Sequence, residues 1–247
     1  MRLNVVPAAS GRLAASLLVL CAAPAMAGDA ANFDPIGFSA DGRYFAYEEY
    51  GIQDGSGFPY ANVFLVDLLA DKWVGRPVRV RIDDESAGLP AARRQAMDQA
   101  RPVLDGAALD TPVSTLLLNA DGEVGSDGME VTFGMFGNGL DTPRNTFTLG
   151  VETFASTSTE PCASYGMEEP VQGFALALSD QAGSTAEIYR DQSVPASRGC
   201  VSDYRIHAVL SPYPPGMAAS PMVAVVSVYS LGFEGPDRRF VTVPIAP

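Results

Sequence analysis

Hydrophobic and polar residues alternate with a period of two in many short segments of this chain, a pattern that predicts β-strands separated by turns. In the clearest case, residues 76–82, Val78, Val80 and Ile82 share one face and two arginines occupy the other. Similar segments rich in β-branched and aromatic residues bring the prediction to eleven strands. These cover residues 42–50, 61–67, 76–82, 113–118, 129–136, 146–154, 173–178, 186–189, 204–210, 222–229 and 239–245.

One segment, residues 89–103, has helical character instead. It combines strong helix formers with small apolar residues at helical spacing, which suits close packing on a sheet. Pro90 fits a first helical turn, and Ser86 is a candidate N-cap. The apolar stripe contains Leu89, Ala92, Ala96, Ala100 and Val103, and the opposite face, expected to be solvated, contains Arg93, Arg94, Asp98 and Arg101.

These elements predict a mainly-β fold, with antiparallel sheets in a sandwich-like or partial propeller-like arrangement and one helix. Residues 37–67 resemble one blade of the Tol-type β-propellers, in which a similar Asp-Gly turn leads into the second strand. A closed propeller needs at least about sixteen strands, so eleven strands and one blade signature favour a sandwich or a curled sheet assembly. Residues 43–66 also echo residues 222–243, which fits either a duplicated hairpin or chance similarity.

Residues 1–27 have the features of a secretory signal peptide. Two arginines precede a short apolar run, and Ala25-Met26-Ala27 forms a cleavage motif before Gly28. That run is too short to span a bilayer comfortably, and no other segment approaches about 18 uninterrupted apolar residues. We therefore expect a single mature domain, residues 28–247, with no membrane span and a periplasmic or secreted location.

Composition agrees with a folded, acidic protein. The chain has 247 residues, of which 47% are hydrophobic and 18% charged, which excludes an intrinsically disordered acidic tail. Its formal net charge is −13, and removing the two arginines of the signal leaves 14 basic and 29 acidic residues, a charge of −15. Nucleic acids and anionic membrane surfaces are therefore poor partners.

Two cysteines, Cys162 and Cys200, remain once the signal is removed. In an oxidising compartment such a pair most simply forms one disulfide, here closing a loop of about 38 residues. The alternative is two free thiols or a redox pair, although the spacing lacks the C-x-x-C pattern of redox motifs.

The residues of familiar catalytic machinery are scarce. His207 is the only histidine, so any serine-histidine-aspartate or zinc arrangement would have to include it. It alternates with apolar residues in a predicted strand, where a hydrogen-bonded structural histidine is expected. The sequence contains no G-x-S-x-G, P-loop, G-x-G-x-x-G or H-E-x-x-H motif, and no cofactor is expected.

Carboxylates are the remaining catalytic candidates. Glu48 and Glu49 are adjacent on a predicted strand, so their side chains point to opposite faces and cannot form one dyad. Whichever is buried needs an arginine or backbone donors, and Arg238 or Arg239 could supply them. Each glutamate is then either half of a structural ion pair or a carboxylate that faces a ligand or sugar.

The acidic segment 119–130 is a weak calcium candidate. Asp121, Glu123, Asp127 and Glu130 occupy positions spaced as in an EF-hand loop. The required glycine is replaced by Val124 and the flanks are predicted strands, which excludes a true EF-hand. The two open interpretations are a looser calcium site and an acidic turn loop.

Two Gly- and Pro-rich loops are the best candidates for a binding surface, because their aromatic and charged residues exceed what turn geometry requires. The alternative is that these residues only shape hairpins. The candidate positions are Asp54 and Tyr60 in the first loop and Phe233, Glu234, Asp237, Arg238 and Arg239 in the second, together with Glu48 and Glu49.

Residues 37–60, 195–200 and 232–240 resemble a bacterial family known only as predicted secreted proteins of unknown function. The resemblance implies export and carries no activity to transfer. We expect a non-enzymatic module that binds an envelope protein, a polymer or a small ligand. The alternative is a carboxylate-dependent hydrolase of envelope or extracellular carbohydrate, which requires two acids about 5–10 Å apart in one open cleft.

Overall fold

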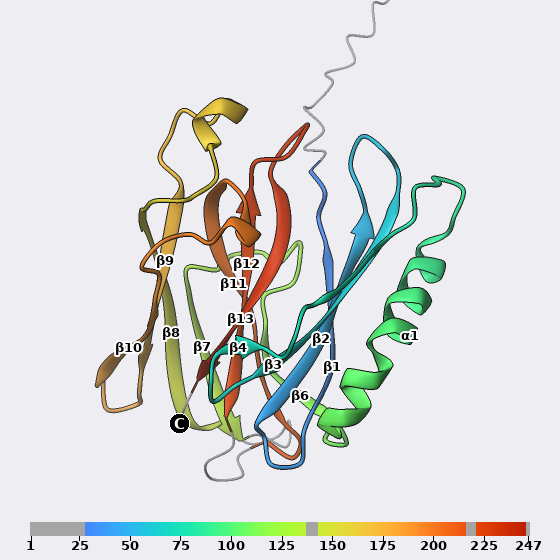
Figure 1. Cartoon of the computed structure of the whole chain (residues 1–247). Coiled ribbons are helices and arrows are strands. Elements are labelled where there is room, and N and C mark those ends of the chain that lie inside the picture. The colour runs from blue at the N-terminus through green and yellow to red at the C-terminus, as the bar shows by residue number, and fades with distance from the viewer. Residues whose placement is uncertain (1–27, 137–142, 216–220, 246–247) are drawn as a thin grey trace, which may run out of the picture.

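A computed structural model of the chain describes residues 28–136, 143–215 and 221–245. The predicted signal peptide lies outside the described residues. Three antiparallel sheets and one α-helix form the described part, so the predicted mainly-β class is confirmed (Figure 1). The sheets stack face to face, and none of the described helices has the length and apolar character of a membrane span.

The helix-side sheet consists of the first five strands. β4 and β5 both pair with the same edge of β3, one at each end. The strands are β1 (Asn32–Phe38), β2 (Tyr44–Ile52), β3 (Pro59–Asp67), β4 (Lys72–Trp73) and β5 (Val78–Arg81).

Two four-stranded sheets complete the fold. In the central sheet the order is β13 (Asp237–Ile245), β12 (Met222–Ser230), β11 (Val201–Pro212) and β6 (Val113–Leu118). In the outer sheet the order is β10 (Thr185–Arg190), β9 (Gln172–Ser179), β8 (Arg144–Ala155) and β7 (Glu130–Phe136).

The central sheet is buried on both faces, which explains the continuous apolar run of β12. Val223 and Val225 pack toward the helix-side sheet, whereas Ala224 and Val226 pack toward the outer sheet. Strands buried on both faces show unbroken apolar runs instead of alternation. The layers therefore follow the order helix, helix-side sheet, central sheet and outer sheet, as Figure 1 shows.

The helix α1 (Leu89–Ala107) packs its small residues on the outward face of the helix-side sheet, as its stripe predicts. It is four residues longer than predicted, because Leu104 and Ala107 continue the buried stripe, whereas Val103 is 37% exposed. The prediction that Ser86 is the N-cap is wrong. Gly88 is the N-cap, and the Ser86 hydroxyl instead donates to Asp84.

All eleven predicted strands are present among the thirteen described, with ends shifted by a few residues. The two missed strands are β1 and β4. β1 contains Pro35 and Gly37 and a bulge between them, which hides its period-two pattern. β4 has only two residues, too few to show a period.

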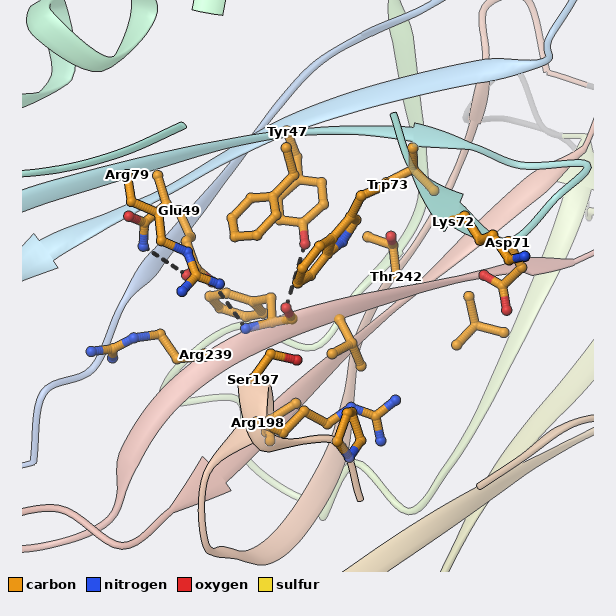
Figure 2. Close-up of a pocket in the computed structure, with 18 of the residues that line it drawn as sticks. Tyr47, Glu49, Asp71, Lys72, Trp73, Arg79, Ser197, Arg198, Arg239 and Thr242 are labelled. Atoms are coloured by element: carbon orange, nitrogen blue, oxygen red, sulfur yellow. Dashed lines mark hydrogen bonds between the residues drawn. The ribbon is translucent and has the colours of Figure 1, made fainter. Parts of the chain in front are cut away.

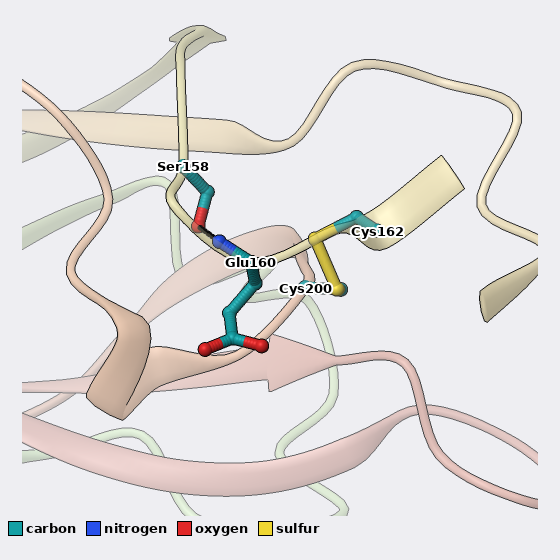
Figure 3. The surroundings of a disulfide bond; sticks show 4 residues. All are labelled: Ser158, Glu160, Cys162 and Cys200. Carbon is teal, nitrogen blue, oxygen red and sulfur yellow. Dashed lines mark hydrogen bonds between the residues drawn. A yellow bond between two sulfur atoms is a disulfide. The ribbon is translucent and has the colours of Figure 1, made fainter. Parts of the chain in front are cut away.

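The predicted disulfide between Cys162 and Cys200 is formed, with the two Cα atoms 5.5 Å apart (Figure 3). Cys162 begins a short 3₁₀ turn after β8, and Cys200 precedes β11. The bond therefore ties a connection of the outer sheet to the central sheet.

Replacing both cysteines by serine should lower the free energy of unfolding by about 3–4 kcal/mol, because the crosslink restricts the unfolded chain over a separation of 38 residues. Urea denaturation of the oxidised protein and of the variant measures this difference. A loss below about 1 kcal/mol would contradict a stabilising role of the disulfide.

Candidate functional site

A candidate site with both aromatic and charged lining residues is a cleft of about 400 Å³ that runs along the edge of β13 (Figure 2). We call it the β13 cleft. The inward face of the helix-side sheet forms one wall, and the segment after β10 contributes to the other. Its lining includes Tyr47, Glu49, Asn62, Phe64, Val66, Asp71, Lys72, Trp73, Arg79, Tyr189, Pro195, Ser197, Arg198, Val228 and residues 239–243.

The backbone of β13 faces this cleft, because β13 pairs with β12 along one edge only. The Phe240 N–H donates to Glu49 Oε2 at 3.2 Å, and the Phe240 carbonyl accepts the Tyr47 hydroxyl at 3.5 Å. Backbone groups alternate in direction along a strand, so the N–H and C=O of Thr242 also point away from β12. Within the part of the chain that the structure describes, no backbone partner occupies this position.

Glu49 lies at the base of the cleft and is only 4% exposed. Its carboxylate accepts hydrogen bonds from the Asn62 side chain at 3.0 Å and from the Phe240 N–H. Burial raises the pKa of Glu49 above its ordinary value, and these hydrogen bonds together with Arg239 and Arg79 oppose that rise.

Glu48 points to the opposite face of β2, as predicted from the strand period. It is buried against α1, where Arg93 donates to it at 2.7 Å. Arg93 also pairs with Asp34 at 2.6 Å and lies 3.7 Å from the Tyr50 ring centroid. The partner of Glu48 is therefore Arg93 and not Arg238 or Arg239, and the prediction that Arg93 is merely solvated is wrong.

Aromatic side chains form one wall of the cleft. Trp73, the only tryptophan, is 44% exposed and packs against Phe64 with the ring centroids 5.7 Å apart. Phe64 in turn stacks on Tyr47 at 4.7 Å. The exposed Trp73 face is thus held on a stack of rings and is available to a ligand.

Four cationic side chains line the same cleft: Lys72, Arg79, Arg198 and Arg239. Arg198 pairs with Asp191 at 2.7 Å, and Arg239 pairs with Asp29 at 2.6 Å. Lys72 and Arg79 have no ion pair with any carboxylate that the structure describes.

The cleft contains two acids, Glu49 and Asp71. In the strand register, Glu49 lies opposite Asn62 of β3. Lys72, the neighbour of Asp71, lies opposite Asp67, five residues further along β3. Five residues of a strand span about 17 Å, well beyond the separation of about 5–10 Å used by glycoside hydrolases. The cleft therefore does not bring together the two carboxylates that the hydrolase alternative requires.

Several residues of the predicted loop surface converge on Asp29, away from the cleft. The Tyr60 hydroxyl and the Arg239 guanidinium each donate to the Asp29 carboxylate at 2.6 Å, and Asp237 accepts the Asp29 N–H at 3.0 Å. Burial raises the pKa of Tyr60. Asp29 itself was missed, because it follows the predicted cleavage motif and precedes every predicted strand.

The remaining members of the predicted surface are dispersed. Phe233 is 82% exposed and Glu234 is also exposed, both in the loop between β12 and β13. Asp54 lies in the loop between β2 and β3. Of the nine predicted positions, only Glu49 and Arg239 line the β13 cleft. The cationic and aromatic residues of the cleft come from six strands and the segment before β11, which no local pattern connects.

The acidic loop and the histidine lie near Arg238. Asp121 forms an ion pair with Arg238, and Glu123 and Asp127 line the same cavity as this pair, whereas Glu130 does not. Among the described residues, no three His, Cys, Asp or Glu side chains are arranged to hold a metal ion, and a calcium role stays a prediction. His207 packs on Phe240 at 5.0 Å, and burial lowers its pKa.

Arg93→Ala should destabilise the protein by about 3–5 kcal/mol, because it leaves the buried carboxylate of Glu48 without its cation. Arg94→Ala removes an exposed arginine from the next position of α1 and should change stability by less than about 0.5 kcal/mol. Urea denaturation measures both. Equal effects in the two variants would contradict a structural role for the Glu48–Arg93 pair.

The raised pKa of Glu49 predicts a pH dependence. The folded state holds this proton more tightly than the unfolded state, so the associated stability is complete below the ordinary pKa of 4.5 and is lost as pH rises through the folded pKa. Glu49→Gln cannot ionise and should lack this loss. Unfolding free energies measured from pH 4 to pH 7 compare the two proteins, and parallel curves would contradict the assignment.

A profile described as "Predicted secreted protein (DUF2259)" matches residues 46–246, which include every strand from β3 onward and most of β2. Neither a curated protein nor a solved structure matches the chain significantly. The match covers most of the fold, including every part of the β13 cleft. The chain therefore belongs to this family of predicted secreted proteins of unknown function.

Proposed function

We propose that this protein is a binding protein of the periplasm or extracellular space, and that its β13 cleft holds an extended acidic peptide segment of a partner protein. The observation that carries the proposal is the pair of unpaired cations, Lys72 and Arg79, in a cleft that also exposes Trp73 and the backbone edge of β13.

The charge distribution supports an anionic ligand. The chain carries 16 basic and 29 acidic residues, yet four of the basic ones, including its only lysine, line this cleft. Burial raises the pKa of Glu49, and partial desolvation raises the pKa of Asp71, whose residue is otherwise exposed. A local concentration of cations in an acidic protein attracts anions and repels other acidic surfaces.

The spacing of the cations supports an extended ligand. Arg79 is paired with Asn62 and Lys72 with Asp67, so the two cations are five residues apart along β3. This corresponds to about 17 Å, the length of about five residues of extended peptide.

The open backbone groups of Thr242 support a peptide over other extended anions. Their N–H and C=O can form the two hydrogen bonds of one antiparallel residue pair, as in recognition by strand addition. The exposed face of Trp73 lies beside Thr242 in Figure 2 and can pack against an apolar side chain of such a peptide.

The single tryptophan provides a direct test. A capped octapeptide of alternating glutamate and valine should change Trp73 fluorescence on titration, and its affinity should fall as salt rises. Arg79→Ala should weaken binding about tenfold, equivalent to about 1.4 kcal/mol. The matched control is Arg101→Ala, which removes an exposed arginine of α1 outside the cleft.

Three results would overturn the proposal. The first is equal binding of the octapeptide in which lysine replaces glutamate. The second is equal weakening by the Arg79 and Arg101 substitutions. The third is binding of an acidic oligosaccharide, such as oligogalacturonate, without binding of the acidic peptide, which would assign the cleft to carbohydrate.

A further inference from the structure

The first described residues are built into the fold. Residues 28–31 lie between the loop that joins β2 to β3 and the loop that joins β12 to β13, as Figure 1 shows. Asp29 is only 3% exposed, and Ala31 is fully buried. Ala30 forms a parallel bridge with Arg238, so this segment extends the edge of the central sheet.

Gly28 occupies a position where only glycine fits. A Cβ atom there would collide with the carbonyl oxygen of Pro236. Gly28 also lines an open cavity of about 470 Å³ together with Asp54 and Gly55 from the loop between β2 and β3 and with the exposed Glu85. Gly28 thus lies against the backbone of Pro236 and shares this cavity with the loop between β2 and β3.

One of the two acids that line this cavity has an unpaired carboxylate oxygen. Asp54 Oδ2 is buried and has no hydrogen-bond partner in the described chain. Asp237, which accepts the Asp29 N–H, is close enough to Asp54 and Asp29 that their charges help to raise its pKa, although burial is the largest cause. A buried carboxylate oxygen without a donor is costly, so a hydrogen-bond donor is expected here, and a cationic donor would also balance the charge of the carboxylate.

We propose that the chain is hydrolysed between Ala27 and Gly28 and that the new α-ammonium group of Gly28 forms an ion pair with Asp54 in this cavity. A peptidase of the secretory route catalyses the addition of one water molecule to the peptide bond. Ala27 leaves with a carboxylate, and Gly28 keeps the amine, which takes up a proton. The Ala25-Met26-Ala27 motif places the cleavage at this bond.

Such a pair connects the processed amino terminus to both loops. Gly28 meets Pro236 of one loop, and Asp54 belongs to the other. The amine keeps its proton more tightly in the folded state, so this contribution to stability is complete below the ordinary α-amino pKa of about 8. It is lost as pH rises through the higher folded pKa.

The chain has one lysine, which makes a selective test practical. The full precursor carrying Lys72→Arg is exported, and the processed protein is purified. Amino-terminal sequencing should begin at Gly28-Asp29. The α-amine of this Lys72→Arg protein, the parent for the variants below, is then its only amine. Acetylation should lower the melting temperature of the parent by about 2–4 °C. An Asp54→Asn version of the Lys72→Arg protein should have a lower melting temperature before acetylation, and acetylation should not lower it further.

Asp105→Asn, an exposed aspartate on α1, is the matched control and should respond to acetylation as the parent does. A second measurement, the pKa of the amine from the pH dependence of its acetylation rate in the parent, needs no Asp54 variant and should exceed 8. An amino terminus at another residue, an equal response in the Asp54→Asn protein, no response at all, or an α-amino pKa at or below its ordinary value would each overturn the ion pair. None of these outcomes depends on what the β13 cleft binds.

Discussion

The burial of the central sheet on both faces is the constraint on which the rest of the structure depends. β12 sends successive side chains into two different cores, so nearly every position from Met222 to Val228 must be apolar. Such a strand stabilises the fold only when a sheet covers each face. The helix-side and outer sheets supply these covers, and α1 then covers the remaining apolar face of the helix-side sheet.

The same arrangement creates an edge that has to be satisfied. β13 is the last strand of the central sheet, and its backbone groups at Arg238 pair with residues 29–31. At Phe240 they bond instead to Glu49 and Tyr47, and at Thr242 they face the β13 cleft. Edge strands invite pairing with other chains. Here the backbone of residues 29–31 covers the edge at Arg238, two side chains cover it at Phe240, and the backbone groups of Thr242 stay open.

Period-two and helical patterns were sufficient to predict the class, eleven strands and the helix, and the cysteine count together with the expected export was sufficient to predict the disulfide. They also placed Glu48 and Glu49 on opposite faces. They did not find the partner of Glu48, because Arg93 reaches it from α1, 45 positions along the chain. The cleft was missed for the same reason, since Lys72, Arg79, Arg198 and Thr242 meet only after three sheets have stacked.

The roles of the charges distinguish this site from a carboxylate-based active site. Glu49 has donors on both sides, and Glu48, Asp29 and Asp191 each bind an arginine, so the buried acids hold strands and layers in register. A catalytic acid instead needs a free oxygen that faces the substrate and a second carboxylate within reach. In the described chain the unpaired groups of the β13 cleft are two cations, a backbone edge and one carboxylate, that of Asp71. That distribution suits the recognition of an extended anionic chain, because such a chain can pair with the cations and form hydrogen bonds with the β13 backbone at the same time.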